Sequence, residues 1–184
     1  MRYKSIHDAE LFIAAARGNI ESIRDVLGKG GLINAVNEKG ETPLMHASAN
    51  ERVEAVDYLL RRGAAVNMRD RNGWAAVTYA VVSGNAGIVR MLADKNADLD
   101  LRESERGYTL LMLAIEMENV GMIRQLLNLG AKTDSVDRNG ISTVQHAIAT
   151  KNDKVVDMVL SNGNPNVLHD IGRKVDEAFW EAGK

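Results

Sequence analysis

The chain has 184 residues, of which 45% are hydrophobic, and this is enough apolar material for a folded core. Its formal net charge of -2 argues against binding to nucleic acid or to an anionic membrane surface. The absence of cysteine excludes disulfides, thiol catalysis and cysteine-bound metals. No apolar run approaches the roughly 20 residues that a membrane-spanning helix needs, so we expect no membrane insertion.

The first apolar segment predicts two helices. Leu11, Phe12 and the alanines that follow fit the buried face of a helix over residues 9–16, which ends at Gly18. A second helix is predicted over residues 20–27. No polar hairpin precedes this pair, as is typical of an end unit in a repeat array.

Four frames of similar sequence follow, and each is opened by a glycine. The glycines are Gly40, Gly73, Gly107 and Gly140, so the spacings are 33, 34 and 33 residues. A polar turn precedes each glycine, and a second apolar run follows each frame. A period near 33 residues is a signature of a repeat architecture and outranks any single motif.

The second copy carries the clearest helix signals. The hydroxyl of Thr42 can cap the first helix, and Pro43 suits the first helical position. Gly63 lets the chain leave the second helix in a left-handed conformation. These signals predict a helix, a turn and a second helix within one period.

The third copy is the most divergent. Ala75 and Ala76 replace Thr-Pro, and Asn96 replaces the glycine after the second helix, where asparagine tolerates the left-handed conformation. The connection over residues 101–106 is one residue longer than its counterparts, which accounts for the spacing of 34. We expect the extra residue at a hairpin tip, where it adds little loop entropy.

The run Thr42-Pro43-Leu44-Met45-His46-Ala47 resembles the Thr-Pro-Leu-His-x-Ala phrase of the ankyrin repeat family, and only this copy keeps the proline. The resemblance implies an all-α repeat solenoid of helix-turn-helix units with β-hairpin or turn fingers. It has about five repeats plus a partial C-terminal cap. The implied single domain covers 1–184, with an N-terminal cap repeat at 5–36, repeats at 37–69, 70–103, 104–136 and 137–168, and a cap at 169–184.

The search for catalytic chemistry finds little. His46 and His146 occupy the same column three copies apart, about 30 Å if repeats stack at about 10 Å each, so they cannot share a metal. Neither a Gly-rich phosphate loop nor a Gly-x-Ser-x-Gly nucleophile elbow occurs. We therefore predict no enzyme activity, no cofactor and no metal.

The family resemblance places partner binding on the concave face, which is built from the hairpin tips and the outward side of the first helices. The residue after each frame glycine is Glu41, Trp74, Tyr108 or Ile141, and we expect this column to face solvent. Aromatic side chains among arginines are typical of an interaction hot spot. The predicted protein-binding residues are Trp74, Tyr108, Ile141, Val82, Met117, Arg71, Arg106, Arg138 and Glu105. In the alternative interpretation, Trp74 and Tyr108 fold against their own hairpins and only stiffen the array.

These features predict a non-enzymatic protein that binds one partner protein and occludes its surface. The short form resembles small bacterial ankyrin proteins, some of which inhibit an enzyme made by the same cell. A passive scaffold that bridges two proteins is the alternative, although the second helices show no apolar excess for a second patch. We expect a soluble protein that is monomeric on its own, does not bind nucleic acid, and is cytoplasmic unless it is the mature form of an exported protein.

Overall fold

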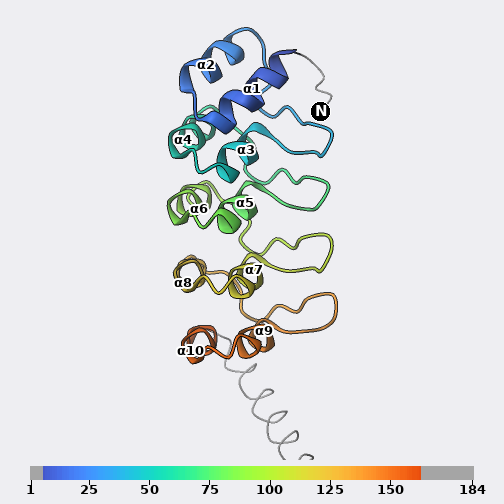
Figure 1. Cartoon of the computed structure of the whole chain (residues 1–184), viewed down its shortest axis with the longest axis vertical. Helices are drawn as coiled ribbons and strands as arrows, with labels where there is room; N and C mark the ends of the chain where they lie inside the picture. Colours follow the sequence, from blue (N-terminus) through green and yellow to red (C-terminus); the bar gives the residue numbers. More distant parts are fainter. Residues whose placement is uncertain (1–5, 163–184) are drawn as a thin grey trace, which may run out of the picture.

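The computed structural model describes residues 6–162 of the chain. Ten helices form within these residues (Figure 1). They are α1 (Ile6–Arg17), α2 (Ile20–Gly28), α3 (Pro43–Ala49), α4 (Val53–Arg61), α5 (Ala76–Ser83), α6 (Ala86–Ala93), α7 (Leu110–Glu116), α8 (Val120–Asn128), α9 (Thr143–Ala149) and α10 (Asp153–Ser161).

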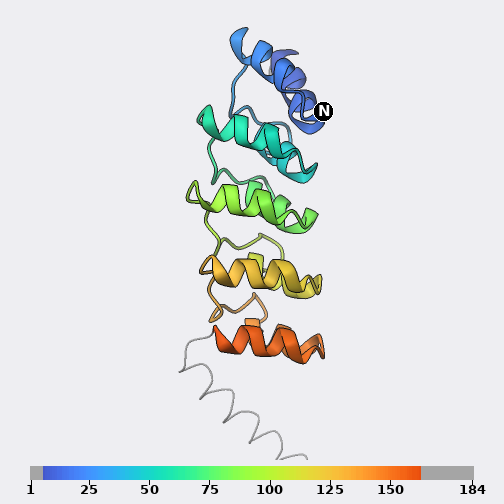
Figure 2. The ribbon, with the colours of Figure 1, turned by 90° about the vertical axis from the view of Figure 1, so that its left-hand side faces the viewer.

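The helices stack as five antiparallel pairs into one elongated array (Figure 1). The odd-numbered helices form an inner column, in which each helix packs on the next, and the even-numbered helices form an outer column. Figure 2 shows the outer helices α4, α6, α8 and α10 nearly parallel to one another, whereas the N-terminal helices (blue) are tilted relative to them. Loops project from the inner column on the side opposite to the outer helices (Figure 1). This arrangement confirms the predicted all-α repeat solenoid.

Burial differs between the two columns. In the outer helix α6, only Ile88, Val89 and Leu92 are buried, which leaves a polar face for solvent. In the inner helix α7, by contrast, every residue from Leu110 to Ile115 is buried, because helices and loops cover it on several sides. The core therefore runs along the inner column.

The predicted helix boundaries follow from local chemistry. Thr42 accepts the backbone N–H of Met45 at 3.3 Å, and Pro43 is the first residue of α3. Gly63 and Asn96 both have positive φ angles, +85° and +61°, and so end their outer helices as expected. The first helix is longer than the predicted range of residues 9–16: it begins at Ile6 and ends at Arg17.

The loops contain almost no β-structure. Two isolated bridges, Arg102 with Thr109 and Val136 with Ser142, are the pairings found within residues 6–162. The fingers are therefore hydrogen-bonded turns rather than stranded hairpins. The C-terminal cap predicted at 169–184 lies outside the described residues.

Candidate protein-binding site

Four turns project from the inner column, and we call them finger A (37–41), finger B (70–74), finger C (103–108) and finger D (137–141). In each finger, the backbone N–H of the first residue donates to the carbonyl of the last residue. The N–O distances are 3.1 Å in finger A, 2.9 Å in finger B, 3.0 Å in finger C and 2.9 Å in finger D.

The side chain of the first residue also anchors its finger. In finger B, Asp70 Oδ1 accepts the backbone N–H groups of Asn72 and Trp74, each at 2.8 Å. Asn37 and Asp137 accept the corresponding pairs in fingers A and D. In each of these three fingers, one Oδ1 atom of the side-chain amide or carboxylate thus holds the turn in a single conformation.

Finger C does the same with a longer side chain. Glu103 accepts the backbone N–H groups of Glu105 at 2.7 Å, Tyr108 at 3.2 Å and Arg106. Burial opposes the charged form of Glu103, but these three hydrogen bonds outweigh it and lower the pKa of its carboxyl. The extra methylene of glutamate therefore compensates for a turn that is one residue longer.

Backbone hydrogen bonds join neighbouring fingers. Arg71 N donates to Lys39 O at 2.9 Å, and Arg138 N donates to Arg106 O at 2.9 Å. Between fingers B and C the donor is Ser104, whose N–H reaches Asn72 O at 2.8 Å. Ser104 thus corresponds to Arg71 and Arg138, which identifies Glu105 as the inserted residue and Glu103, one position before the predicted repeat boundary, as the first residue of finger C.

Each finger is also linked to the inner helix that follows it. Glu41 Oε2 lies 2.9 Å from His46 Nε2 in finger A, and the Tyr79 hydroxyl donates to Asp70 Oδ2 at 2.7 Å in finger B. In finger C, Arg106 Nη1 donates to both oxygens of Glu116, at 2.7 and 2.9 Å. In finger D, Asp137 Oδ2 lies 3.1 Å from His146 Nε2.

These links shift the pKa values of their members. Burial and the hydrogen bond to Asp70 raise the pKa of Tyr79 far above its usual range. Burial favours the protonated forms of Glu41 and Asp137, but their hydrogen bonds outweigh it and lower both pKa values. The hydrogen bonds that lower the pKa of Glu41 come from Asn37 and His46, and those that lower the pKa of Asp137 come from the N–H groups of Ile141 and Asn139 and from the ring of His146. The Tyr79 hydroxyl also donates to Glu41 Oε1, at 3.3 Å.

The sequence predicts that Trp74 and Tyr108 face solvent, and the structure shows both residues half-buried. The Trp74 ring meets the Tyr79 ring edge-to-face, with 5.2 Å between centroids. The Tyr108 ring meets His146 edge-to-face at 4.8 Å, and the Arg106 guanidinium lies 4.1 Å from its centroid. Both aromatic rings are thus held in place by neighbours while part of each stays accessible.

A groove of about 430 Å³ lies between fingers B and C. It brings together four of the nine predicted binding residues, Arg71, Trp74, Glu105 and Arg106. The other lining residues are Asn72, Glu103 and Ser104. These three residues were not among the nine predicted binding residues.

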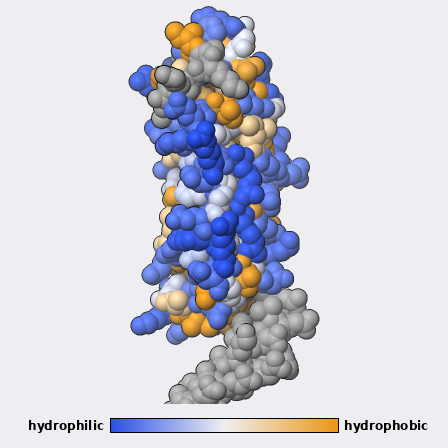
Figure 3. Space-filling model, turned by 90° about the vertical axis from the view of Figure 1, so that its right-hand side faces the viewer, coloured by the Kyte–Doolittle hydropathy of each residue, from blue (hydrophilic) through white to orange (hydrophobic). Residues whose placement is uncertain are grey.

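The remaining predicted residues lie outside this groove. Val82, Met117 and Ile141 are exposed, by 37%, 45% and 37%, and Arg138 is exposed on finger D. Tyr108 does not line the groove either. Figure 3 shows that the middle of the finger side is largely hydrophilic, whereas apolar side chains gather toward its two ends. The middle of this face therefore offers mixed polar contacts around aromatic rings.

The finger–helix links were not predicted as a set. Their signal was the column six residues after each frame glycine, which holds His46, Tyr79, Leu113 and His146. Leu113 cannot form a polar link, and its repeat uses Glu116 instead. Only the structure shows that these side chains turn toward the fingers.

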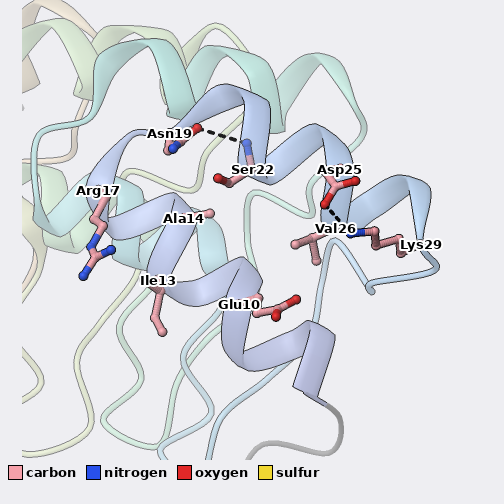
Figure 4. A pocket seen from close by; sticks show the side chains of 9 residues that line it. All are labelled: Glu10, Ile13, Ala14, Arg17, Asn19, Ser22, Asp25, Val26 and Lys29. Atoms are coloured by element: carbon pink, nitrogen blue, oxygen red, sulfur yellow. Dashed lines mark hydrogen bonds and ion pairs between the residues drawn. The ribbon is translucent and has the colours of Figure 1, made fainter.

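A second hollow, of about 330 Å³, lies between α1 and α2 at the N-terminal end of the array. Figure 4 shows Arg17 and Lys29 at opposite ends of it. Lys29 pairs with Asp25 at 2.6 Å, and Asn19 accepts the N–H of Ser22 at 3.0 Å. None of the predicted binding residues lines this hollow.

Residues 6–162 contain neither a metal-binding cluster nor a membrane-spanning helix. No cluster of three or more His, Asp or Glu side chains is arranged to hold a metal ion there. In the same part of the chain, no helix combines the length and the apolar character needed to cross a bilayer.

The sequence of the chain matches family models and known proteins. A family model described as ankyrin repeats (3 copies) matches residues 11–103, and an ankyrin repeat model matches residues 106–138. The chain is 32% identical over 132 residues to mouse ankyrin repeat and SAM domain-containing protein 6, covering 71% of this chain and 11% of that protein. The rat protein of the same name is 33% identical over 132 residues, again covering 71% of this chain and 11% of that protein.

A putative ankyrin repeat protein of fowlpox virus is 31% identical over 94 residues, or 50% of this chain and 22% of that protein. The chain thus spans 11% of the length of the rodent proteins and 22% of the length of the viral one. They come from rodents and a virus and do not support the bacterial origin expected from the sequence. Ankyrin repeats are generic protein–protein interaction modules and are typically not enzymes. Because the family models together match well over half of its residues, the chain belongs to the ankyrin repeat family.

Proposed function

We propose that the protein binds one partner protein through fingers B and C and occludes the surface that it covers. The observation that carries this proposal is the groove between these fingers, which is lined by Trp74, Arg71, Glu105 and Arg106. Tryptophan and arginine are the residue types most enriched among interaction hot spots.

The rigidity of the fingers supports binding rather than mere stiffening of the array. Each finger is closed by its own hydrogen bonds, joined to its neighbour and linked to an inner helix. A surface that is already ordered loses little conformational entropy when it binds. The contact of Trp74 with Tyr79 stiffens the array and also holds the indole ready for a partner.

Occlusion follows from a rigid face that covers part of another protein. If the covered surface contains an active site, the partner enzyme is inhibited, and we propose this outcome. The test is affinity capture from the protein's native source, with the intact chain compared with the Trp74→Ala, Tyr108→Ala double variant. Tyr58→Ala is a matched control, because Tyr58 lies in the outer helix α4 and contacts Arg62 there.

The expected result is one stoichiometric partner that the double variant loses and the control retains, together with loss of the partner's activity in the one-to-one complex. Thermal unfolding of each variant checks that loss of binding is not loss of fold. A partner retained by the double variant would move the interface away from fingers B and C. A ternary complex with unchanged activity would support the scaffold function.

A further inference from the structure

The groove between fingers B and C carries two charges that the described part of the chain does not neutralise. Arg71 and Glu105 are exposed at the tips of the two fingers, and their charged groups form no ion pair or hydrogen bond within residues 6–162. The charged groups of Arg106 and Glu103, the other two charged residues of the groove, already have partners. Arg106 pairs with Glu116, and Glu103 accepts three backbone N–H groups. The open charges are therefore one cation on finger B and one anion on finger C.

The four charged residues of the groove sum to zero, so a polyanion such as nucleic acid gains little from it. A neutral apolar segment would leave Arg71 and Glu105 poorly solvated at the rim of an interface. The groove is therefore complementary to a segment that itself carries one acidic and one basic side chain.

The spacing of these charges follows from the spacing of the fingers. Neighbouring repeats are about 10 Å apart, the packing distance of adjacent helices. An extended chain advances about 3.3 Å per residue, so about three residues span the two fingers. Trp74 lines the same groove as the two charged residues, with its ring held against Tyr79.

We propose that the partner presents an extended segment with an acidic and a basic residue about three positions apart and an apolar side chain between them. The acidic residue pairs with Arg71, the basic residue pairs with Glu105, and the apolar side chain packs on Trp74. This inference rests on the proposed function and adds the chemistry of the partner's segment. The insertion of Glu105 has a role in this scheme, because it adds an anion at a position that does not exist in the other three fingers.

The test uses a displayed library of random linear peptides of 12 residues, selected on the intact chain. A parallel selection uses the Arg71→Glu, Glu105→Arg variant, in which the two charges are exchanged. Both residues are exposed and unpaired, so the exchange leaves the fold intact, which thermal unfolding verifies. We expect peptides selected on the wild type to carry the acidic–apolar–basic pattern and to bind the exchanged variant about tenfold more weakly.

A synthetic peptide whose acidic and basic residues are swapped should regain affinity for the exchanged variant, and this reciprocal rescue is the decisive result. The inference is overturned if selected peptides lack the charge pattern, if the exchange leaves their affinity unchanged, or if no peptide is enriched. Peptides that depend on Trp74 but not on the two charges would overturn the inference and leave the proposed function in place. The affinity capture described above tests that function separately.

Discussion

The two middle fingers, B and C, differ from the two end fingers, A and D, in how they are fixed to the inner helices. Histidine–carboxylate pairs hold the end fingers, at 2.9 and 3.1 Å. A tyrosine–aspartate hydrogen bond and an arginine–glutamate pair hold the middle fingers. The backbone hydrogen bonds are nearly the same in all four, so side chains alone give each finger its own response to pH and to mutation.

The middle of the array also has the tightest contact between fingers. A Cβ atom added at Gly73 would lie 2.5 Å from Ser104 Oγ and 3.2 Å from Ser104 N, whereas one added at Gly140 would meet no atom of residues 6–162 within 4 Å. Both glycines have φ angles near +77°, so they share the backbone requirement and differ in crowding. The groove between fingers B and C therefore borders the closest of these finger-to-finger approaches.

The largest expected effect comes from breaking this packing. Gly73→Ala combines a left-handed residue, which costs about 1–2 kcal/mol, with overpacking of about 1–3 kcal/mol. Gly140→Ala carries only the first cost, so it is the matched control. Urea unfolding of both variants measures the difference. Equal losses would mean that finger C moves away from Gly73 without cost.

The next effect tests the match between turn length and side-chain length in finger C. Glu103→Asp shortens the anchor, and we expect unfolding free energy to fall by about 2 kcal/mol, because three partly buried backbone N–H groups lose their acceptor. Deleting Glu105 in the same variant recreates the spacing of finger B, with an aspartate three residues before the glycine. The double change should recover most of the stability in urea unfolding, and failure to do so would contradict the proposed compensation.

The fold was largely predictable from the sequence because the signals are local and repeated. Thr42, Pro43 and Gly63 define helix boundaries by their own backbone chemistry, and the 33-residue period then places the other copies. The position of the inserted residue was less accessible. The sequence alone aligned Ser104 with the first residues of the other turns, whereas the hydrogen bonds of Glu103 show that the long side chain takes this role.

The candidate site was only partly predictable for a related reason. Trp74, Arg71, Glu105 and Arg106 could be selected because they are aromatic or charged residues at fingertip positions. Their partners could not, because Tyr79 and Glu116 reach the fingers from helices, and the direction of a side chain depends on packing between repeats. The half-burial of Tyr108 likewise depends on His146 in the next repeat.

A smaller effect is expected at the tyrosine link of finger B. Tyr79→Phe removes the donor to Asp70, which we expect to cost about 1 kcal/mol at neutral pH. Burial and Asp70 raise the pKa of Tyr79, so its contribution is complete below about pH 10, the usual tyrosine value, and decreases as pH rises above it. Urea midpoints measured from pH 7 to 11 should fall more steeply for the wild type than for the variant, and parallel curves would contradict this.

The smallest effect is expected from a substitution in finger D that copies the anchoring residue of finger A. Asn37 shows that an amide oxygen can accept both backbone N–H groups, at 2.9 and 3.0 Å. Asp137→Asn should therefore keep the turn and lose only the carboxylate that lies 3.1 Å from His146 Nε2.

Against the effect of burial, the N–H groups of Ile141 and Asn139, and then His146, lower the pKa of Asp137. The stabilisation from its carboxylate is therefore present above about pH 4, the usual aspartate value, and is lost as pH falls through the lowered pKa. The wild type should be slightly more stable than the variant at pH 6, and the urea midpoints should converge toward pH 3. A difference that persists at pH 3 would mean that the substitution disrupts the turn itself. The amide of Asn37 would then hold finger A only with the help of Glu41, which accepts from Asn37 at 2.7 Å. Finger D has Ile141 in place of Glu41 and would lack this help.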